Sequence, residues 1–193
     1  DALCFRFTAA GTWDSSFGTN GFAIATVTSS DDIAYAVKVL PDGRIIEAGS
    51  SRSSGPLQQA LIIRWTANGT YDPAFGTAPE FWDPAGAQGL ETINSIVPRA
   101  DGTYIVVGSS TVTTPSASNG FLGGLTAANA TPDPDFGVAG YYPVTFGDVT
   151  MFNAGLLQPD GKLLVAGNSR TGSANAQMVV ARLLRLSGHG EHD

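Results

Sequence analysis

The sequence predicts an all-β fold built from repeats of about 59 residues, and three observations support this prediction. The tripeptide Asp-Gly-x recurs with a glycine seven residues after its Asp, at Asp42, Asp101 and Asp160. An Asp-x-x-Phe-Gly segment recurs with nearly the same period, at Phe17, Phe75 and Phe136. No window keeps apolar residues at helical spacing for three turns without Gly or Pro. Self-similarity at a fixed period is the signature of a repeat architecture.

Each repeat reads as four short strands. In the first unit the opening strand spans residues 22–27, and a second strand spans 33–40. A Pro-Asp-Gly turn then joins 33–40 to 44–48 as a hairpin, because Asp-Gly is a strong signal for a two-residue β-turn. A Ser/Gly-rich loop leads to the last strand at 60–66.

The strands carry continuous apolar runs rather than alternating ones, for example at 61–63, 104–107 and 178–181. A sheet with one wet face should alternate, so these runs predict sheets that are covered on both faces. Four-stranded sheets stacked around an axis meet that demand, and the repeat length suits one blade of a β-propeller. An open β-solenoid is the alternative, although its coils are shorter than this repeat.

We therefore predict a single repeat domain over residues 1–186, followed by a polar tail at 187–193. The domain is a partial propeller of three four-stranded blades plus one extra N-terminal strand. The predicted blades span about 9–66, 67–126 and 127–186, and residues 1–8 form the closing strand of a preceding blade. Propellers close with four to eight blades, so we expect a second copy, or the remaining half of the ring, to cover the two open faces.

The composition narrows the class of partner. The chain of 193 residues has 10 Lys and Arg against 17 Asp and Glu, a net charge of −7. Ten scattered cations oppose nucleic-acid binding, which needs clustered Lys and Arg to neutralise phosphates. No apolar run approaches the ~18 residues of a membrane-spanning helix. The lone Cys4 has no partner for an internal disulfide, and its apolar neighbours predict a buried thiol.

The third repeat carries a resemblance to a known family. Its segment Pro-Asp-Gly-Lys-Leu-Leu-Val-Ala-Gly at 159–167, taken with Asp-x-x-Phe-Gly, resembles the bacterial delta-60 repeat, a propeller-type unit. The similarity extends over about residues 3–186, and the second repeat departs most, with Arg99-Ala100 before its Asp101. The resemblance implies an exported bacterial protein, that is, a secreted, periplasmic or cell-surface one. It implies no family-wide catalytic activity and supplies no catalytic residues.

The candidate binding residues lie on loops. Three Ser-, Thr- and Gly-rich loops, at 50–59, 109–119 and 168–177, are expected at one end of all blades, where binding groups often lie on a rigid scaffold. Arg52 and Arg170 occupy equivalent positions and are candidates to face one anionic or glycan partner. Trp82 is the aromatic candidate. The serines of the repeated Gly-Ser or Gly-Asn-Ser step complete the set of weak ligand-binding candidates: Ser51, Ser110 and Ser169. This pattern predicts a binding or structural module.

An extracellular hydrolase of esterase or glycosidase type is the alternative, with a site at the propeller centre or between chains. The sequence has no Gly-x-Ser-x-Gly elbow, and its histidines, His189 and His192, lie in the polar tail. We therefore assign no catalytic residue and no cofactor. The aspartates of the Asp-x-x-Phe-Gly segments are interpreted as turn residues rather than calcium ligands, so no metal site is predicted.

Overall fold

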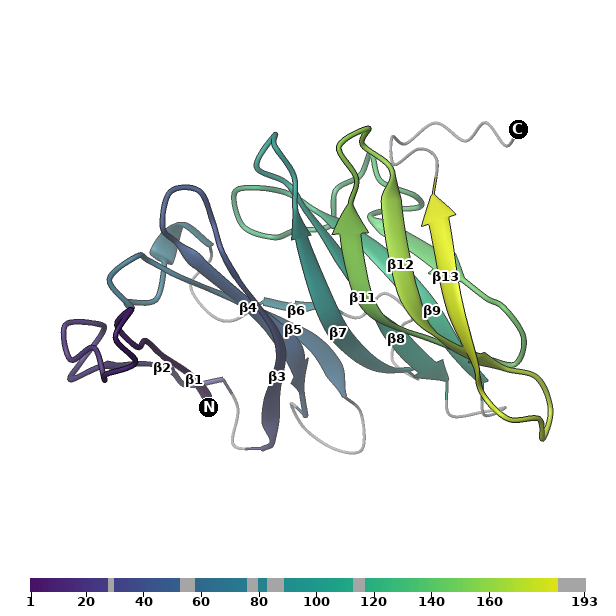
Figure 1. The fold of residues 1–193 in the computed structure, drawn as a ribbon, viewed down its shortest axis with the longest axis horizontal. Coiled ribbons are helices and arrows are strands. Elements are labelled where there is room, and N and C mark those ends of the chain that lie inside the picture. The colour runs from purple at the N-terminus through teal and green to yellow at the C-terminus, as the bar shows by residue number, and fades with distance from the viewer. Residues whose placement is uncertain (28–29, 53–57, 76–79, 83–88, 113–116, 184–193) are drawn as a thin grey trace.

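The computed structural model describes residues 1–27, 30–52, 58–75, 80–82, 89–112 and 117–183, and in these the fold is all-β (Figure 1). The elements are β1 (Ala2–Phe5), β2 (Phe22–Ala25), β3 (Asp32–Val39), β4 (Ile45–Ser51), β5 (Gln59–Trp65), a 3-10 turn (Pro73–Phe75), β6 (Glu80–Trp82), β7 (Gly89–Pro98), β8 (Tyr104–Val112), β9 (Ala117–Leu125), β10 (Tyr141–Val144), β11 (Val149–Leu157), β12 (Leu163–Arg170) and β13 (Gln177–Leu183). Within the same ranges, no helix has the length and apolar character needed to cross a bilayer.

The described strands hydrogen-bond into three sheets of two, four and seven strands. The seven-stranded sheet consists of two antiparallel parts joined by one parallel pairing, so we describe four antiparallel sheets that follow one another in chain order (Figure 1). The first sheet is β1–β2, the second is β3–β4–β5–β6, the third is β7–β8–β9–β10 and the fourth is β11–β12–β13. A single parallel bridge, Gln58–Leu90, joins the second sheet to the third. The equivalent bridge, Val149–Ser118, joins the third sheet to the fourth. The described strands do not close into a ring.

The sheets are offset by one strand from the predicted units. The segment 22–27 was expected to open the first unit, yet Phe22–Ala25 pairs with Ala2–Phe5 and not with β3. The second and third sheets therefore begin with an inner hairpin (β3–β4 and β7–β8), take their third strand next, and receive their fourth strand from beyond the Asp-x-x-Phe-Gly segment. In the described residues the fourth sheet has an inner hairpin (β11–β12) and a third strand, and the first sheet has only β1 and β2. The boundaries 9–66, 67–126 and 127–186 do not match this hydrogen bonding.

The Asp-Gly turns close the inner hairpins as predicted, but with loops of three residues rather than two: the Leu40 N–H donates to the Arg44 carbonyl across residues 41–43. In each turn the Asp side chain accepts a hydrogen bond from the backbone N–H two residues on, at 3.1 Å for Asp42, 3.0 Å for Asp101 and 3.2 Å for Asp160. The following glycines have φ of +85°, +85° and +81°, a conformation that costs glycine little. Side-chain hydrogen bonds from Arg44, Thr103 and Lys162, together with these backbone ones, hold the pKa of the three carboxyls below its ordinary value.

The glycine seven residues after each of these aspartates faces a β-bulge on the neighbouring strand. The bulges follow the same period, between Ala34 and Ala36 and at the equivalent positions of β7 and β11. A Cβ on Gly108 would lie 2.0 Å from the carbonyl oxygen of Thr92 and below 3 Å from the Phe121 ring. Gly49 and Gly167 have the same close approach to the bulged strand. Close backbone contact therefore explains the repeated glycine.

We predict that Gly108→Ala destabilises the chain by more than ~2 kcal/mol, because the added methyl group overlaps backbone that the bulge fixes. Gly11→Ala is the control: Gly11 has φ of +76° but no atom within 4 Å of an added Cβ, so it loses only ~1 kcal/mol. Denaturant unfolding of both variants measures the difference. Equal losses would show that the bulge tolerates a side chain.

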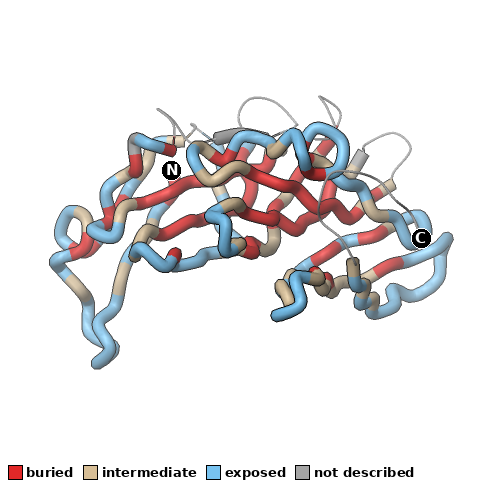
Figure 2. Tube along the Cα trace, turned by 90° about the horizontal axis from the view of Figure 1, so that it is seen from above, coloured by how far each residue is buried: buried red, intermediate tan, exposed pale blue. Residues whose placement is uncertain are grey.

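The third sheet is buried on both faces. We call the face toward the preceding sheet the leading face and the other the trailing face. The leading face of the third sheet includes Ile96 and Val106 and packs on Ile46 and Ile62 of the second sheet. The trailing face packs on the fourth sheet in a second cluster, formed by Val97, Ile105, Val107, Leu122, Phe136, Phe152, Leu163 and Val165. Figure 2 shows this buried band along the middle strands. The prediction of sheets covered on both faces is confirmed for this sheet.

An arginine on the third strand ties the second sheet to the next one. The Arg64 side chain is buried, and its Nε donates to Asp72 at 2.8 Å. Its Nη1 and Nη2 donate to the carbonyls of Ala127 and Ala128 at 2.8 and 3.1 Å, while the guanidinium lies 4.4 Å above the Phe75 ring. Asp72 and Phe75 belong to the Asp-x-x-Phe-Gly segment. The motif therefore positions an arginine that bridges two sheets.

The same arrangement recurs one repeat earlier in a more exposed form. Arg6 donates to Asp14 at 2.7 Å and to the carbonyl of Ala67 at 2.9 Å, and it lies over the Phe17 ring. In the third sheet Gly124 takes the place of the arginine, and the Phe136 side chain fills the space beside it. The Asp-x-x-Phe-Gly period thus marks the contacts between sheets.

We predict that Arg64→Ala destabilises the chain by about 3 kcal/mol, because buried Asp72 keeps only one cation, Arg44, in a longer contact of 3.4 Å, and two carbonyl groups lose their donor. Arg6→Ala serves as the matched control: it removes the same motif from a half-exposed position and costs about 1 kcal/mol. Chemical denaturation of both variants provides the comparison. A loss for Arg64→Ala no larger than that for Arg6→Ala would contradict the bridging role.

Candidate functional site

The predicted candidate serines lie in strands, at the lower ends of the inner hairpins in Figure 1. Ser51, Ser110 and Ser169 are all buried. The Ser51 hydroxyl donates to Asp32 across the hairpin, and the Ser110 hydroxyl donates to Glu91 at 3.0 Å from the equivalent position. Each pair joins residues that lie directly opposite in the strand register. The serines were expected on solvated loops, and the structure instead gives two of them a carboxylate partner inside the sheet.

Ser169 differs from the other two because a threonine, Thr150, stands opposite it. The Thr150 hydroxyl is buried and accepts a hydrogen bond from the backbone N–H of Phe146 at 2.7 Å. A hydrogen-bonded serine–carboxylate pair therefore closes the open end of two inner hairpins, and the third has a serine opposite a threonine at this position. We interpret these pairs as the support that fixes the loops beyond them.

Arg52 and Arg170 lie beside these pairs and are exposed. The Nη1 of Arg52 lies 3.9 Å from Asp31, and the backbone carbonyl of Arg170 accepts a hydrogen bond from the backbone N–H of Asp148 at 3.0 Å. The two arginines belong to the second and fourth sheets, at the same edge of the fold (Figure 1). Trp82 ends β6, where its backbone pairs with Ala60, and its side chain lies outside the described part of the chain. The structure does not test their binding roles.

The chemistry of the serine pairs differs from that of a hydrolase. A serine nucleophile needs a base that removes its proton and a third group that orients this base. Ser51 and Ser110 contact carboxylates directly. His189 and His192, the imidazoles of the alternative hypothesis, lie outside the described residues. The hydrolase stays a prediction, and the hydrogen bonds of Ser51 and Ser110 give these two residues a structural role.

The Asp-x-x-Phe-Gly carboxyls cap their own turns. Asp14, Asp72 and Asp133 each accept a hydrogen bond from the backbone N–H two residues on. Burial alone would raise the pKa of Asp72, but hydrogen bonds from the Ala74 N–H and from Arg64 hold it below its ordinary value. These contacts confirm the interpretation of the aspartates as turn residues.

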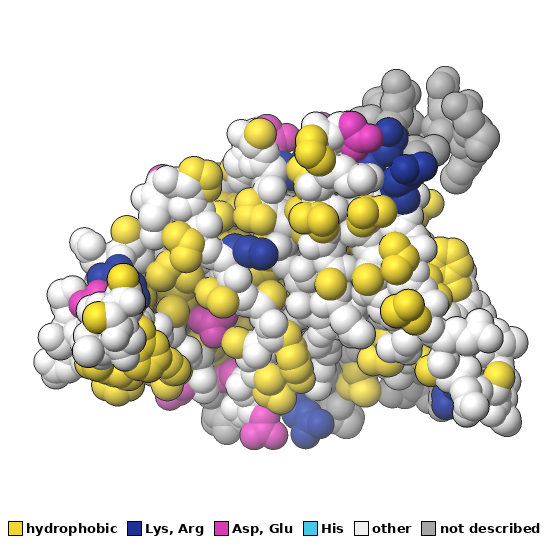
Figure 3. Space-filling model, in the orientation of Figure 1, with side chains coloured by type: hydrophobic (Ala, Val, Ile, Leu, Met, Phe, Trp, Pro, Cys, Tyr) yellow, Lys and Arg dark blue, Asp and Glu magenta, His cyan; other side chains and the backbone are white. Residues whose placement is uncertain are grey.

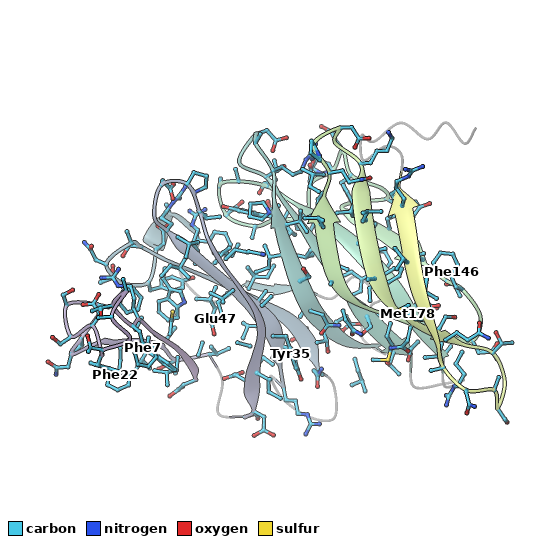
Figure 4. The ribbon with its side chains drawn as sticks, in the orientation of Figure 1. Phe7, Phe22, Tyr35, Glu47, Phe146 and Met178 are labelled. Carbon is cyan, nitrogen blue, oxygen red and sulfur yellow. The ribbon has the colours of Figure 1, made fainter. Side chains whose placement is uncertain are left out.

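A cavity of about 170 Å³ opens between the first and second sheets. Its walls come from β1, β3, β4 and β5 and are apolar at Leu3, Leu61 and Ile63. Two carboxyl groups, Asp32 and Glu47, also line it. Figure 4 shows Glu47 between the first sheet and β3. Asp32 is engaged by Ser51 and by the chain's N-terminal ammonium group, which lies 2.7 Å away.

Glu47 was not among the predicted site residues. Its carboxylate accepts a hydrogen bond from the Trp65 indole at 3.0 Å, yet burial raises its pKa above the ordinary value. Burial, together with the nearby Glu47 charge, also raises the pKa of the Cys4 thiol to about 11, although Cys4 is only half-buried rather than fully buried as the sequence predicts. Comparison of the repeats gives the signal that was missed: the positions equivalent to Glu47 are Val106 and Val165.

We predict that Glu47→Gln raises the melting temperature by a few degrees at neutral pH. The folded chain holds the Glu47 proton more tightly than the unfolded chain, so wild-type stability falls as pH rises from the unfolded pKa through the raised one. Glutamine removes this penalty, and the gain should vanish below about pH 4.

Thermal melts of the wild type and Glu47→Gln at several pH values test this sign. Asp135→Asn, which makes the same carboxylate-to-amide change at an exposed turn position, is the control. A Glu47→Gln gain that persists at acidic pH would point to packing rather than ionisation.

Comparison with protein families supports a propeller-type repeat. Two segments, residues 40–75 and 158–185, match the model of a family described as "Domain of unknown function (DUF5122) beta-propeller". Both begin just before an Asp-Gly turn and include the second and third strands of a sheet. The match supports the all-β, propeller-type character of the chain and not the delta-60 name. No curated protein matches the chain.

Proposed function

We propose that the chain is part of a secreted or cell-surface bacterial β-propeller of delta-60 type that binds a protein or glycan partner. The binding edge is the one at which β4, β8 and β12 end. The observation that carries this proposal is the repeated serine–carboxylate pairing of Ser51 with Asp32 and Ser110 with Glu91. These buried pairs fix the ends of two inner hairpins, so the loops beyond them start from rigid positions.

The guanidinium groups at this edge, rather than its net charge, favour a partner with carboxylate or sulfate groups, because exposed Asp31 and Asp148 lie beside Arg52 and Arg170. Arg52 and Arg170 are two of only ten Lys and Arg residues in a chain of net charge −7, and both are exposed. Guanidinium groups bind carboxylates and sulfates through paired hydrogen bonds, which suits a uronate-containing or sulfated glycan. A hydrolase is the weaker alternative, because Ser51 and Ser110 each contact a carboxylate.

The proposal predicts that an array of acidic and neutral glycans detects binding to the acidic ones. Arg52→Ala and Arg170→Ala should each weaken that binding by roughly tenfold, since each removes a charge-assisted contact. The matched control is Arg99→Ala, beside the Asp101 turn at the opposite edge of the fold, which should bind normally. Equal effects of all three substitutions would show that binding depends on net charge and not on this edge. A failure to bind any acidic glycan would contradict the proposal.

A further inference from the structure

The fourth sheet exposes a face that the third sheet buries. Along the trailing face of the third sheet, Val97 and Leu122 are 6% and 0% exposed because they pack on the fourth sheet. The equivalent residues of the fourth sheet, Leu156 and Val180, are both 63% exposed. Leu156 pairs with Leu164, and Val180 pairs with Ala166, so these side chains form one apolar surface on β11, β12 and β13. Figure 3 shows hydrophobic side chains gathered over these strands.

The second sheet exposes the complementary face over its inner hairpin. On the leading face of the third sheet, Ile96 is 1% exposed because the second sheet covers it. Its equivalent in the second sheet, Val37, is 59% exposed. The first sheet covers Ile45, Ile63 and Trp65 on β4 and β5 but leaves β3 open. A two-stranded inner hairpin of a preceding sheet would cover this exposed part of the second sheet.

β1 has the repeat position of a third strand. Arg6 after β1 and Arg64 in β5 make the same contacts to an Asp-x-x-Phe-Gly segment, and β2 pairs with β1 as β6 pairs with β5. In complete sheets the third strand also pairs with a second strand, as β5 does with β4. In the described part of the chain, β1 has only β2 beside it. The other edge of β1 can therefore form backbone hydrogen bonds with a strand that has the repeat position of β12.

We propose that the β11–β12 hairpin of one copy completes the first sheet of a second copy. The hairpin would place its trailing face, with Leu156 and Leu164, on Val37 of the second copy, and β12 would pair with β1. The completed sheet would run β11, β12, β1, β2, in the strand order of the second and third sheets. The occupant is a second copy because this chain contains both surfaces, and each has a buried equivalent in the contact between two of its own sheets.

This arrangement requires β1 of the second copy to replace β13, because both are third strands and β12 has one edge for them. β13 is the strand that can leave at low cost. No residue of β13 is buried, whereas most residues of β5 and β9 are. Met178 of β13 projects from the end of the fourth sheet (Figure 4). β1, in contrast, is held by β2 and by packing on the second sheet.

The contact is heterologous, so it either closes or continues into a filament. The described strands of each copy would contribute the second and third sheets and half of two others, which amounts to three sheets. Two copies supply six and three copies supply nine, and propellers have about four to eight. A closed pair of chains therefore fits the architecture.

The register of β13 provides a direct test with the lone cysteine. Cys4 has the same repeat position as Val180, and Val180 pairs with Ala166. In the proposed sheet Cys4 of one copy thus lies opposite Ala166 of the other, and directly opposed antiparallel residues have the Cα spacing of a disulfide. Ala166→Cys in the full chain, oxidised with copper phenanthroline at mildly alkaline pH, should yield covalent dimers in which Cys4 is joined to the introduced thiol. Peptide mass mapping identifies the link.

Two controls define the result. Val138→Cys puts an exposed thiol on a turn outside both surfaces and should leave the chain monomeric on a non-reducing gel. Ala166→Cys combined with Cys4→Ser should also fail to cross-link.

In parallel, light scattering of the wild type should give twice the mass of one chain. Links between two introduced thiols, a mass that grows with concentration, or a single-chain mass even at about 100 µM would each overturn the proposal. Glycan binding plays no part in this readout, so the two proposals fail separately.

Discussion

The structure depends on one constraint: each sheet is apolar on both faces and has to be covered by its neighbours. Val106 and Val107 are adjacent in β8, and they pack in two different cores, one with the second sheet and one with the fourth. At ~25 cal/mol per Å² of buried apolar surface, this double burial is the main favourable term available to a small all-β chain. The polar contacts of Arg64 act at the rim of that packing and orient neighbouring sheets.

Contacts within each sheet explain the repeated glycines: a β-bulge brings the backbone of one strand against its neighbour and leaves no room for a side chain at Gly49, Gly108 and Gly167. The stacking of the sheets explains why the ends of the inner hairpins use paired polar groups. Ser110 and Glu91 are buried between sheets, where an unpaired hydroxyl or carboxylate would cost more than a hydrogen bond contributes.

Local signals in the sequence were sufficient for the strands and turns, because Asp-Gly and Asp-x-x-Phe-Gly act through backbone hydrogen bonds within a few residues. The sheet to which Phe22–Ala25 belongs was predicted wrongly. This segment lies between β1 and the β3–β4 hairpin in the chain, and only tertiary packing selects which of them it pairs with. The serines were misplaced for a similar reason: their acidic partners lie 19 residues away. Glu47 was overlooked although its equivalents are valines, because a single charge in an apolar run does not disturb the strand pattern.

Methyl NOEs from adjacent residues of β8 test the central claim most directly. The stacked sheets require Val106 to show contacts with methyl groups of the second sheet, such as those of Ile46 and Ile62, and Val107 to show contacts with Val165 of the fourth. Contacts of both valines with their own sheet alone, or rapid solvent access to either side chain, would contradict the stacking of sheets on which the whole account rests.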